Sequence, residues 1–204
     1  MKLIRRKNLE RNKKKLFNLL KEDKIKYAKE SFEGTEILND EEKILISKWI
    51  DEKKVFKFNL VYSSKKDGES ASNFHYNCDG VSPTVVIIKD TNGNKLGGYT
   101  TSSWAQSPVG GSYAREQNAF TFSLSLKKKV EQADKFTKYS IYRNNGYGPT
   151  FGSHYLHIAN GCTGNTSSYT ACGSGYDPNS NLFGNKETKY FQVACYEVFH
   201  VINI

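Results

Sequence analysis

Apolar and other residues alternate with a period of two along much of the chain from residue 55 onward, which is the period of a β-strand. In the segment 55–62, for example, Phe56, Phe58 and Leu60 take every second position. The run Val-Val-Ile-Ile at 85–88 is apolar throughout, as expected of a central strand with both faces buried. Strands are therefore predicted at 55–62, 85–88, 95–101, 120–126, 138–143, 155–158 and 190–202.

These strands follow one another as hairpins. Asn92-Gly93 is a strong two-residue hairpin signal, so the strand at 85–88 is predicted to turn back into the strand at 95–101. Strands outnumber helices after residue 55. The predicted fold is therefore mainly β (α+β), a two-sheet antiparallel β-sandwich with short flanking helices, preceded by N-terminal helices.

A helical period replaces the strand period just before residue 55. Asp40 is predicted to cap this helix, and Glu41 and Glu42 lie in its first turn, where the helix dipole favours negative charge. Its apolar residues fall on one face, which we expect to pack against the sheet: Leu45, Ile46, Trp49 and Ile50.

The first 30 residues contain a narrow apolar stripe that fits a helix: Leu9, Leu16, Leu20 and Tyr27. A solvated, partly disordered basic tail explains the segment as well, and both interpretations stay open. Residues 31–39, interrupted by Gly34, are predicted to be a linker. The expected organisation is a basic segment at 1–30, a linker with a lead-in helix at 31–54, and the sandwich domain at 55–204.

Positive charge is concentrated at the N-terminus. Residues 1–30 contain 12 Lys/Arg and 4 Asp/Glu, a net of +8, whereas residues 31–204 contain 18 and 17, a net of +1. This balance argues against a nucleic-acid-binding surface on the domain itself. The basic segment predicts docking on an acidic surface, with these candidate residues: Arg5, Arg6, Lys7, Arg11, Lys13, Lys14 and Lys15.

No stretch of the sequence has the length and hydropathy of a membrane-spanning helix, and the first residues lack the apolar run of a secretory signal. We therefore expect a cytoplasmic protein, associated with an organelle membrane complex or the cytoskeleton through its partners. Thiols stay reduced in that compartment, so all four cysteines are expected to be free: Cys78, Cys162, Cys172 and Cys195.

Several short motifs, in this order and spacing, resemble the TLDc domain family over about residues 55–202. They are Leu60-Val61-Tyr62-Ser63-Ser64 with Asp67-Gly68, Phe74-His75, Cys78-Asp79-Gly80, Pro83-Thr84, Gly97-Gly98-Tyr99-Thr100 with Trp104, Asn118-Ala119-Phe120, Phe122-Ser123-Leu124, Tyr147-Gly148-Pro149-Thr150-Phe151-Gly152, Phe191, Val193 and Glu197-Val198-Phe199. The resemblance implies a two-sheet sandwich and no established catalytic residues; the sequence shows no plausible ligand cluster, so no cofactor is predicted. The resemblance also implies binding to the vacuolar-type proton pump and a link to oxidative-stress resistance.

The glycine-rich motifs of this resemblance are candidate partner contacts, because glycine marks places where a backbone bends or another chain approaches closely. Tight turns at a corner of the sandwich explain the same glycines. Neither motif has the Lys and Ser/Thr placement of a phosphate-binding loop. The candidate contact residues are Gly97, Gly98, Tyr99, Trp104, Gly148, Pro149, Thr150, Phe151, Gly152 and Glu197.

The chain departs from the family pattern at three places. Ser153-His154-Tyr155 replaces a longer glycine-rich run that carries an Asp. Cys195 stands where the family has the first acidic residue of an acid-x-acid pair, which leaves Glu197 alone. Leu96 replaces an aromatic residue before the Gly-Gly-Tyr motif. The first two departures remove negative charge from positions that would otherwise be candidate partner contacts.

A thiol-dependent enzyme is the catalytic alternative. A short helix predicted after Ser70 carries His75 and Cys78 three residues apart, hence on one face, where they resemble a base and a nucleophile. A catalytic thiolate needs nearby positive charge and an oxyanion site, and neither is visible in the sequence. A buried Cys78 beside a hydrogen-bonding His75 is the simpler interpretation.

Metal binding is not expected. His154 and His157 with Cys162 and Cys172 form a zinc set on paper, but residues three apart on a strand point to opposite faces and no Cys-x-x-Cys pair occurs. A redox-sensing cysteine, or a disulfide between Cys162 and Cys172 under oxidation, stays open.

The functional hypothesis is therefore a non-catalytic protein-interaction domain that docks on a subunit of the vacuolar-type proton pump. The second hypothesis is a scaffold component that binds an acidic surface such as a tubulin tail through residues 1–30. The third is the thiol enzyme, in which Cys78 would react with alkylating agents faster than the other cysteines.

Overall fold

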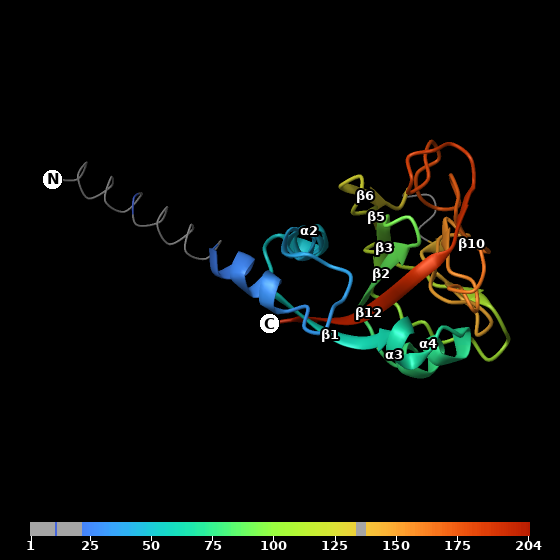
Figure 1. The fold of residues 1–204 in the computed structure, drawn as a ribbon, viewed down its shortest axis with the longest axis horizontal. Helices are drawn as coiled ribbons and strands as arrows, with labels where there is room; N and C mark the ends of the chain where they lie inside the picture. The colour runs from blue at the N-terminus through green and yellow to red at the C-terminus, as the bar shows by residue number, and fades with distance from the viewer. Residues whose placement is uncertain (1–10, 12–21, 134–137) are drawn as a thin grey trace.

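The computed structural model describes residue 11 and residues 22–133 and 138–204 (Figure 1). Its largest element is an antiparallel sheet of six strands in the order β1-β12-β2-β3-β5-β6. The strands are β1 (Phe56–Ser63), β2 (Thr84–Asp90), β3 (Lys95–Thr100), β5 (Phe120–Ser123), β6 (Lys128–Glu131) and β12 (Val193–Asn203).

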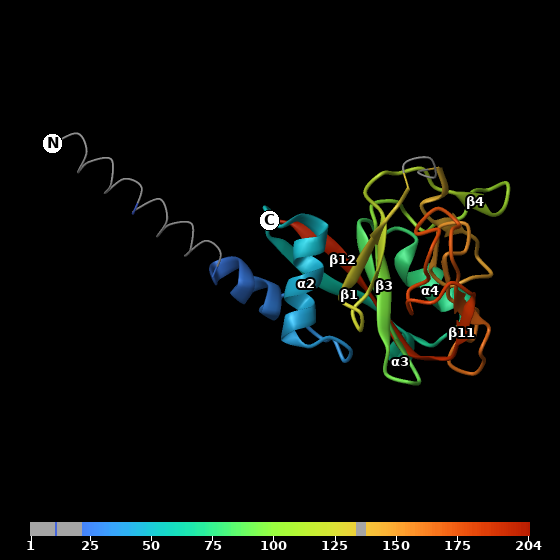
Figure 2. The ribbon, with the colours of Figure 1, turned by 90° about the horizontal axis from the view of Figure 1, so that it is seen from above.

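A second, four-stranded sheet in the order β11-β10-β9-β8 packs against one face of the first. Figure 2 shows this second layer on the side of the six-stranded sheet opposite α2. The remaining strands are β8 (Thr150–Phe151), β9 (Leu156–His157), β10 (Ser168–Thr170), β11 (Lys189–Phe191) and the ribbon of β4 (Ser112–Tyr113) and β7 (Tyr142–Arg143). The predicted mainly β, two-sheet fold is confirmed.

Helical segments come before and after β1 in the chain. Residues 22–30 are helical, and they are followed by α2 (Asp40–Asp51), α3 (Ser64–Asp67) and α4 (Ala71–Cys78). The sequence predicts Asp40 as the cap of α2, but the cap is Asn39: its side chain accepts a hydrogen bond from the Glu42 amide, and the Glu42 carboxylate accepts one from the Asn39 amide. This reciprocal capping box satisfies two amides that the helix itself leaves unpaired.

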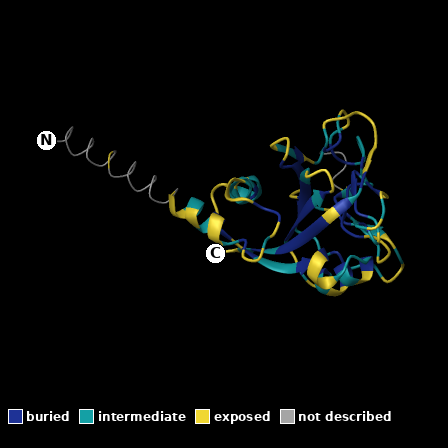
Figure 3. Cartoon of the chain, viewed as in Figure 1, coloured by how far each residue is buried: buried dark blue, intermediate teal, exposed yellow. Residues whose placement is uncertain are grey.

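The central strands of the six-stranded sheet, β2 and β3, are almost entirely buried, and Figure 3 shows the middle of the sheet in dark blue. In β2, Val86 and Ile88 face the second sheet, whereas Val85 and Ile87 face α2 and the residues before it. The segment 31–39, predicted to be a linker, belongs to this second core. Phe32 is 2% exposed and stacks on Phe58 with ring centroids 3.8 Å apart. Ile46 of α2 is fully buried in the same cluster.

The predicted hairpin at Asn92-Gly93 is confirmed, and Asp90 stabilises it by accepting hydrogen bonds from the amides of Asn92 and Asn94 at 2.9 and 2.7 Å. Several predicted strands are shorter than expected. The strand predicted at 120–126 ends at Ser123, and the one predicted at 138–143 is reduced to β7. The strand predicted at 190–202 is divided between β11 and β12. Turns and side-chain hydrogen bonds replace the missing ladder pairs.

Candidate functional site

All ten candidate partner contacts predicted from the sequence are buried. Gly98 shows why its position needs glycine. A Cβ added there would lie 2.6 Å from the ring of Phe151, whose side chain is fully buried. Trp104, 1% exposed, packs edge-on against Phe151 and donates a hydrogen bond from Nε1 to Thr84 Oγ1 at 3.0 Å. Gly98 and Trp104 therefore belong to the packing between the two sheets, whereas Tyr99 belongs to the core on the α2 side.

The segment 148–152 forms a corner where the second sheet begins. Its two ends are fixed by backbone hydrogen bonds, from Gly148 to the carbonyl of Ile158 and from Gly152 to the carbonyl of Ser140, both at 2.9 Å. Gly152 has φ +69°, a conformation that costs glycine little and other residues more. This corner agrees with the turn interpretation of the motif.

Glu197 is also turned inward. It is 2% exposed, and its carboxylate accepts hydrogen bonds from Thr35 Oγ1 and from the Glu36 amide, both at 2.7 Å. Burial raises the pKa of this carboxyl, although the two hydrogen bonds oppose the shift. Glu197 thus connects the segment before α2 to the central strand β12, and its carboxylate is used within the chain. A partner contact at Glu197 stays a prediction.

His75 and Cys78 do not form a base–nucleophile pair. The His75 Nδ1 atom lies 2.6 Å from Asp79 Oδ1, and Nε2 lies 2.9 and 3.1 Å from the carbonyl oxygens of Asn144 and Tyr147. Both ring nitrogens are therefore occupied by other partners. Cys78 is fully buried, and burial raises the pKa of its thiol, which disfavours the reactive thiolate. His75 instead ties α4 to the turn that carries Tyr147.

The residues of the hypothetical zinc set have other environments. The rings of His154 and His157 are 5.5 Å apart, and His157 Nδ1 lies 3.0 Å from Thr150 Oγ1. Burial lowers the pKa of His157 to about 4. Burial also raises the pKa of the Cys162 thiol to about 12. Among the described residues, no three His, Cys, Asp or Glu side chains are grouped as metal ligands would be.

A surface that the sequence analysis did not predict is formed by tyrosines and histidines. Neighbouring rings lie with centroids 4.8 to 6.1 Å apart, and they connect the β4–β7 ribbon to the outer face of the second sheet. Tyr190 is 60% and Tyr147 36% exposed. We call this surface the tyrosine face; its members are Tyr113, Tyr139, Tyr142, Tyr147, His154, His157, Tyr169 and Tyr190.

Strand pairing brings these rings together from distant parts of the sequence. Tyr169 of β10 lies opposite His157 on one side and Tyr190 on the other, and Tyr113 lies opposite Tyr142 in the ribbon. Side chains of paired residues share one face of a sheet. A compositional signal was present: residues 139–176 contain six Tyr, no Asp or Glu, and Arg143 as their one Lys or Arg. That signal alone does not reveal which tyrosines are exposed.

The basic docking candidates fall mostly outside the described residues. Arg11 is described, and it is helical and exposed. Arg5, Arg6, Lys7, Lys13, Lys14 and Lys15 lie outside that part of the structure. Within the described residues, none of the helices has the length and apolar character needed to cross a membrane.

Comparison with known proteins decides the family. The model of the TLDc domain matches residues 31–202, which is most of the chain. The chain belongs to the TLDc domain family. The match begins at residue 31, so the TLDc domain includes the segment whose Phe32 and Thr35 pack and bond against the sheet.

Two similar TLDc proteins carry the name MTOR-associated protein MEAK7. The one from Danio rerio is 29% identical over 43% of this chain and 19% of its own length. The one from Gallus gallus is 30% identical over 52% of this chain and 19% of its own length. TBC1 domain family member 24 from Xenopus tropicalis is 34% identical over 23% of this chain and 8% of its own length. The matched part thus spans a fifth or less of these relatives.

Proposed function

We propose that this TLDc domain is a non-catalytic protein-binding module that docks on a subunit of the vacuolar-type proton pump through its tyrosine face. The observation that carries the proposal is the partly exposed, carboxylate-poor cluster of tyrosines on the outer face of the second sheet. The pump as partner comes from the family resemblance. We propose the cytoplasm, where the pump presents its soluble subunits, as the place of binding.

The composition of the tyrosine face favours protein binding. Tyrosine offers a large, rigid contact area at a small cost in conformational entropy. Tyrosine is also enriched at protein interfaces, because its ring buries apolar area and its hydroxyl forms a hydrogen bond with the partner. Tyr147 sits on a turn held by His75, so part of the surface is preorganised.

The environments of Cys78 and His75 support a binding role over a catalytic one. Cys78 is fully buried, and both ring nitrogens of His75 are occupied. We propose that a contribution to oxidative-stress resistance acts through the bound partner. The MEAK7 relatives are named for association with mTOR, and mTOR is a second protein partner to test.

Binding to purified pump tests the proposal directly. The double variant Tyr147→Ala/Tyr190→Ala removes two exposed rings from the face, and we expect binding to fall about tenfold or more because such anchors carry much of an interface's binding free energy. Tyr76→Ala is the matched control, since Tyr76 is 91% exposed on α4 and makes none of these ring contacts. Its affinity should equal that of the wild type.

The outcomes separate the parts of the proposal. Binding that survives in the double variant would reject the tyrosine face while keeping the pump as partner. Failure of the wild type to bind the pump would reject that partner. Binding to tubulin instead, abolished by deletion of residues 1–30, would favour the scaffold hypothesis.

A further inference from the structure

A groove runs between two helices on the opposite side of the six-stranded sheet from the tyrosine face. The helical residues 22–30 lie beside α2, and Figure 1 shows both to the left of the large sheet. The cavity has a volume of about 480 Å³ and includes Ile25, Ala28 and Ile44 among its lining residues. It is separate from the surface proposed above for the pump.

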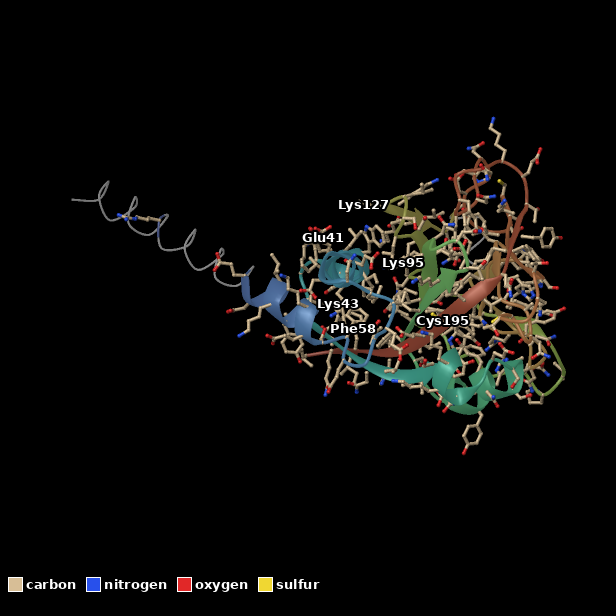
Figure 4. The ribbon with its side chains drawn as sticks, viewed as in Figure 1. Glu41, Lys43, Phe58, Lys95, Lys127 and Cys195 are labelled. Carbon is tan, nitrogen blue, oxygen red and sulfur yellow. The ribbon has the colours of Figure 1, made fainter. Side chains whose placement is uncertain are left out.

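Lysine side chains hold the two helices side by side in antiparallel order. Lys24 Nζ donates a hydrogen bond to the carbonyl oxygen of Lys53 at 2.7 Å, just beyond the end of α2. Lys43 Nζ, near the beginning of α2, donates one to the carbonyl oxygen of Lys29 at 3.1 Å. Figure 4 labels Lys43 on α2, next to the helix that carries Lys29. The two connections fix both ends of the groove.

The floor of the groove is apolar and comes from both helices. Ala28 is 5% exposed, and its small side chain leaves room between the helices. Ile25 and Ile44 are half-buried, so each keeps apolar surface toward the groove. An apolar seam between two helices can be covered by a third helix, which inserts apolar residues at positions i, i+3 and i+4 into the seam.

The rim of the groove is basic. Lys24, Lys48 and Lys53 line it, and none of them takes part in an ion pair among the described residues. The acidic lining residues are Asp51 and Glu52. Asp51 already pairs with Lys54, which also lines the groove, at 3.6 Å. The preceding residues 1–21 add nine Lys/Arg against one Glu, a net of +8. Charge complementarity therefore selects an acidic occupant.

We propose that this groove binds an acidic amphipathic helix of a partner protein. The apolar face of that helix packs on Ile25, Ala28 and Ile44, and its carboxylates face Lys48 and Lys53. The net charge of +8 on residues 1–21 adds to the electrostatic attraction of an acidic partner. The basic segment at 1–30 predicts an acidic partner, and the groove indicates that this partner binds as a helix.

The test uses the full chain and a synthetic acidic amphipathic peptide of about four helical turns, followed by fluorescence anisotropy. We expect Lys48→Glu/Lys53→Glu and, separately, Ile44→Asn to weaken binding by about tenfold or more. Lys186→Glu/Lys189→Glu, an equal charge change at exposed sites of the second-sheet region, is the control and should bind like the wild type. Circular dichroism of each variant checks that it is folded.

A scrambled peptide of the same composition, without an apolar face, should bind at least about tenfold more weakly than the amphipathic one. Equal binding of the two peptides would overturn the proposal, because charge alone would then suffice. So would a wild-type chain that does not bind, an equal loss in the Lys186/Lys189 control, or full binding by the Ile44 variant. Preferential binding to phosphatidylserine vesicles with the same loss in the groove variants would assign the site to a membrane surface and reject the helix. None of these results depends on binding to the pump.

Discussion

The two sheets of this domain are stabilised in different ways. Strands β1, β2 and β12 of the large sheet are eight, seven and eleven residues long, and they bury apolar side chains on both faces. The strands of the second sheet are two or three residues long. There, buried polar groups such as Asn181 and Thr170 complete the structure through side-chain hydrogen bonds. The first sheet supplies a hydrophobic core, and the second supplies a shaped polar and aromatic surface.

The largest effect is expected where the large sheet packs against α2. Phe122 is fully buried, and its ring centroid lies 5.6 Å from that of Trp49. Phe122→Ala should reduce the free energy of unfolding by about 3–5 kcal/mol, because it leaves a cavity between sheet and helix. Urea unfolding measures the change. Tyr76→Ala, at an exposed position, should stay within about 0.5 kcal/mol of the wild type; a similar loss in both variants would contradict the packing described.

The second sheet should respond to pH through His157. Its folded pKa of about 4 lies below the ordinary 6.5, so the unfolded state binds the proton more readily between these values. Stability from this source is complete above pH 6.5 and is lost as the pH falls toward 4. Between about pH 7 and about pH 5 the loss should reach about 2 kcal/mol. His157→Gln should lose less stability over the same interval, and parallel urea midpoints in both proteins would exclude the assignment.

A smaller loss is expected from the polar network of the second layer. Asn181 is fully buried; its Nδ2 donates to the Glu187 carbonyl, and its Oδ1 accepts from the amides of Phe183 and Asn185. Asn181→Ala leaves these groups without their partner and should cost about 1–3 kcal/mol. Thermal or urea unfolding checks this value. Asn179→Ala, an exposed neighbour in the same loop, is the control and should change little.

The smallest effect should be at Thr121, next to Phe122 but on the other face of β5. The sequence alternation predicts that Thr121→Ala costs far less than Phe122→Ala. The structure adds that Thr121 is fully buried and that its hydroxyl has no hydrogen-bond partner among the described residues. Thr121→Val keeps the shape and removes the unpaired group, so stability should be unchanged or rise by about 1 kcal/mol. A clear loss in urea unfolding would mean that the hydroxyl is bonded.

The large sheet could be predicted because its signals are local. The apolar run at 85–88 and the hairpin at Asn92-Gly93 each identify a strand or turn without reference to the rest of the chain. The second sheet gave weaker signals, since strands of two or three residues show no period. The shortening of the strand predicted at 138–143 to β7 follows from this limitation.

The burial of the candidate contacts could not be predicted, because sequence motifs do not distinguish a surface from an interior. Gly98 and Glu197 occur in motifs of the family, and both positions serve internal packing and bonding. The tyrosine face depends on pairing between β9, β10 and β11, and the helix groove depends on how residues 22–30 lie beside α2. Neither arrangement can be obtained from spacing along one chain.

The position of β12 between β1 and β2 in the large sheet has a consequence for biosynthesis. Residues 193–203 pair with β1 on one side and β2 on the other, so β1 cannot join the rest of the sheet before this segment is available. During translation, β1 and the β2–β3 hairpin lack their β12 partner. Apolar side chains such as that of Val85, which lies opposite Phe199 in the folded sheet, are then uncovered. Such exposed strands are prone to aggregate. We therefore expect the nascent chain to depend on chaperones until residue 203 has emerged from the ribosome, and folding to be completed only then.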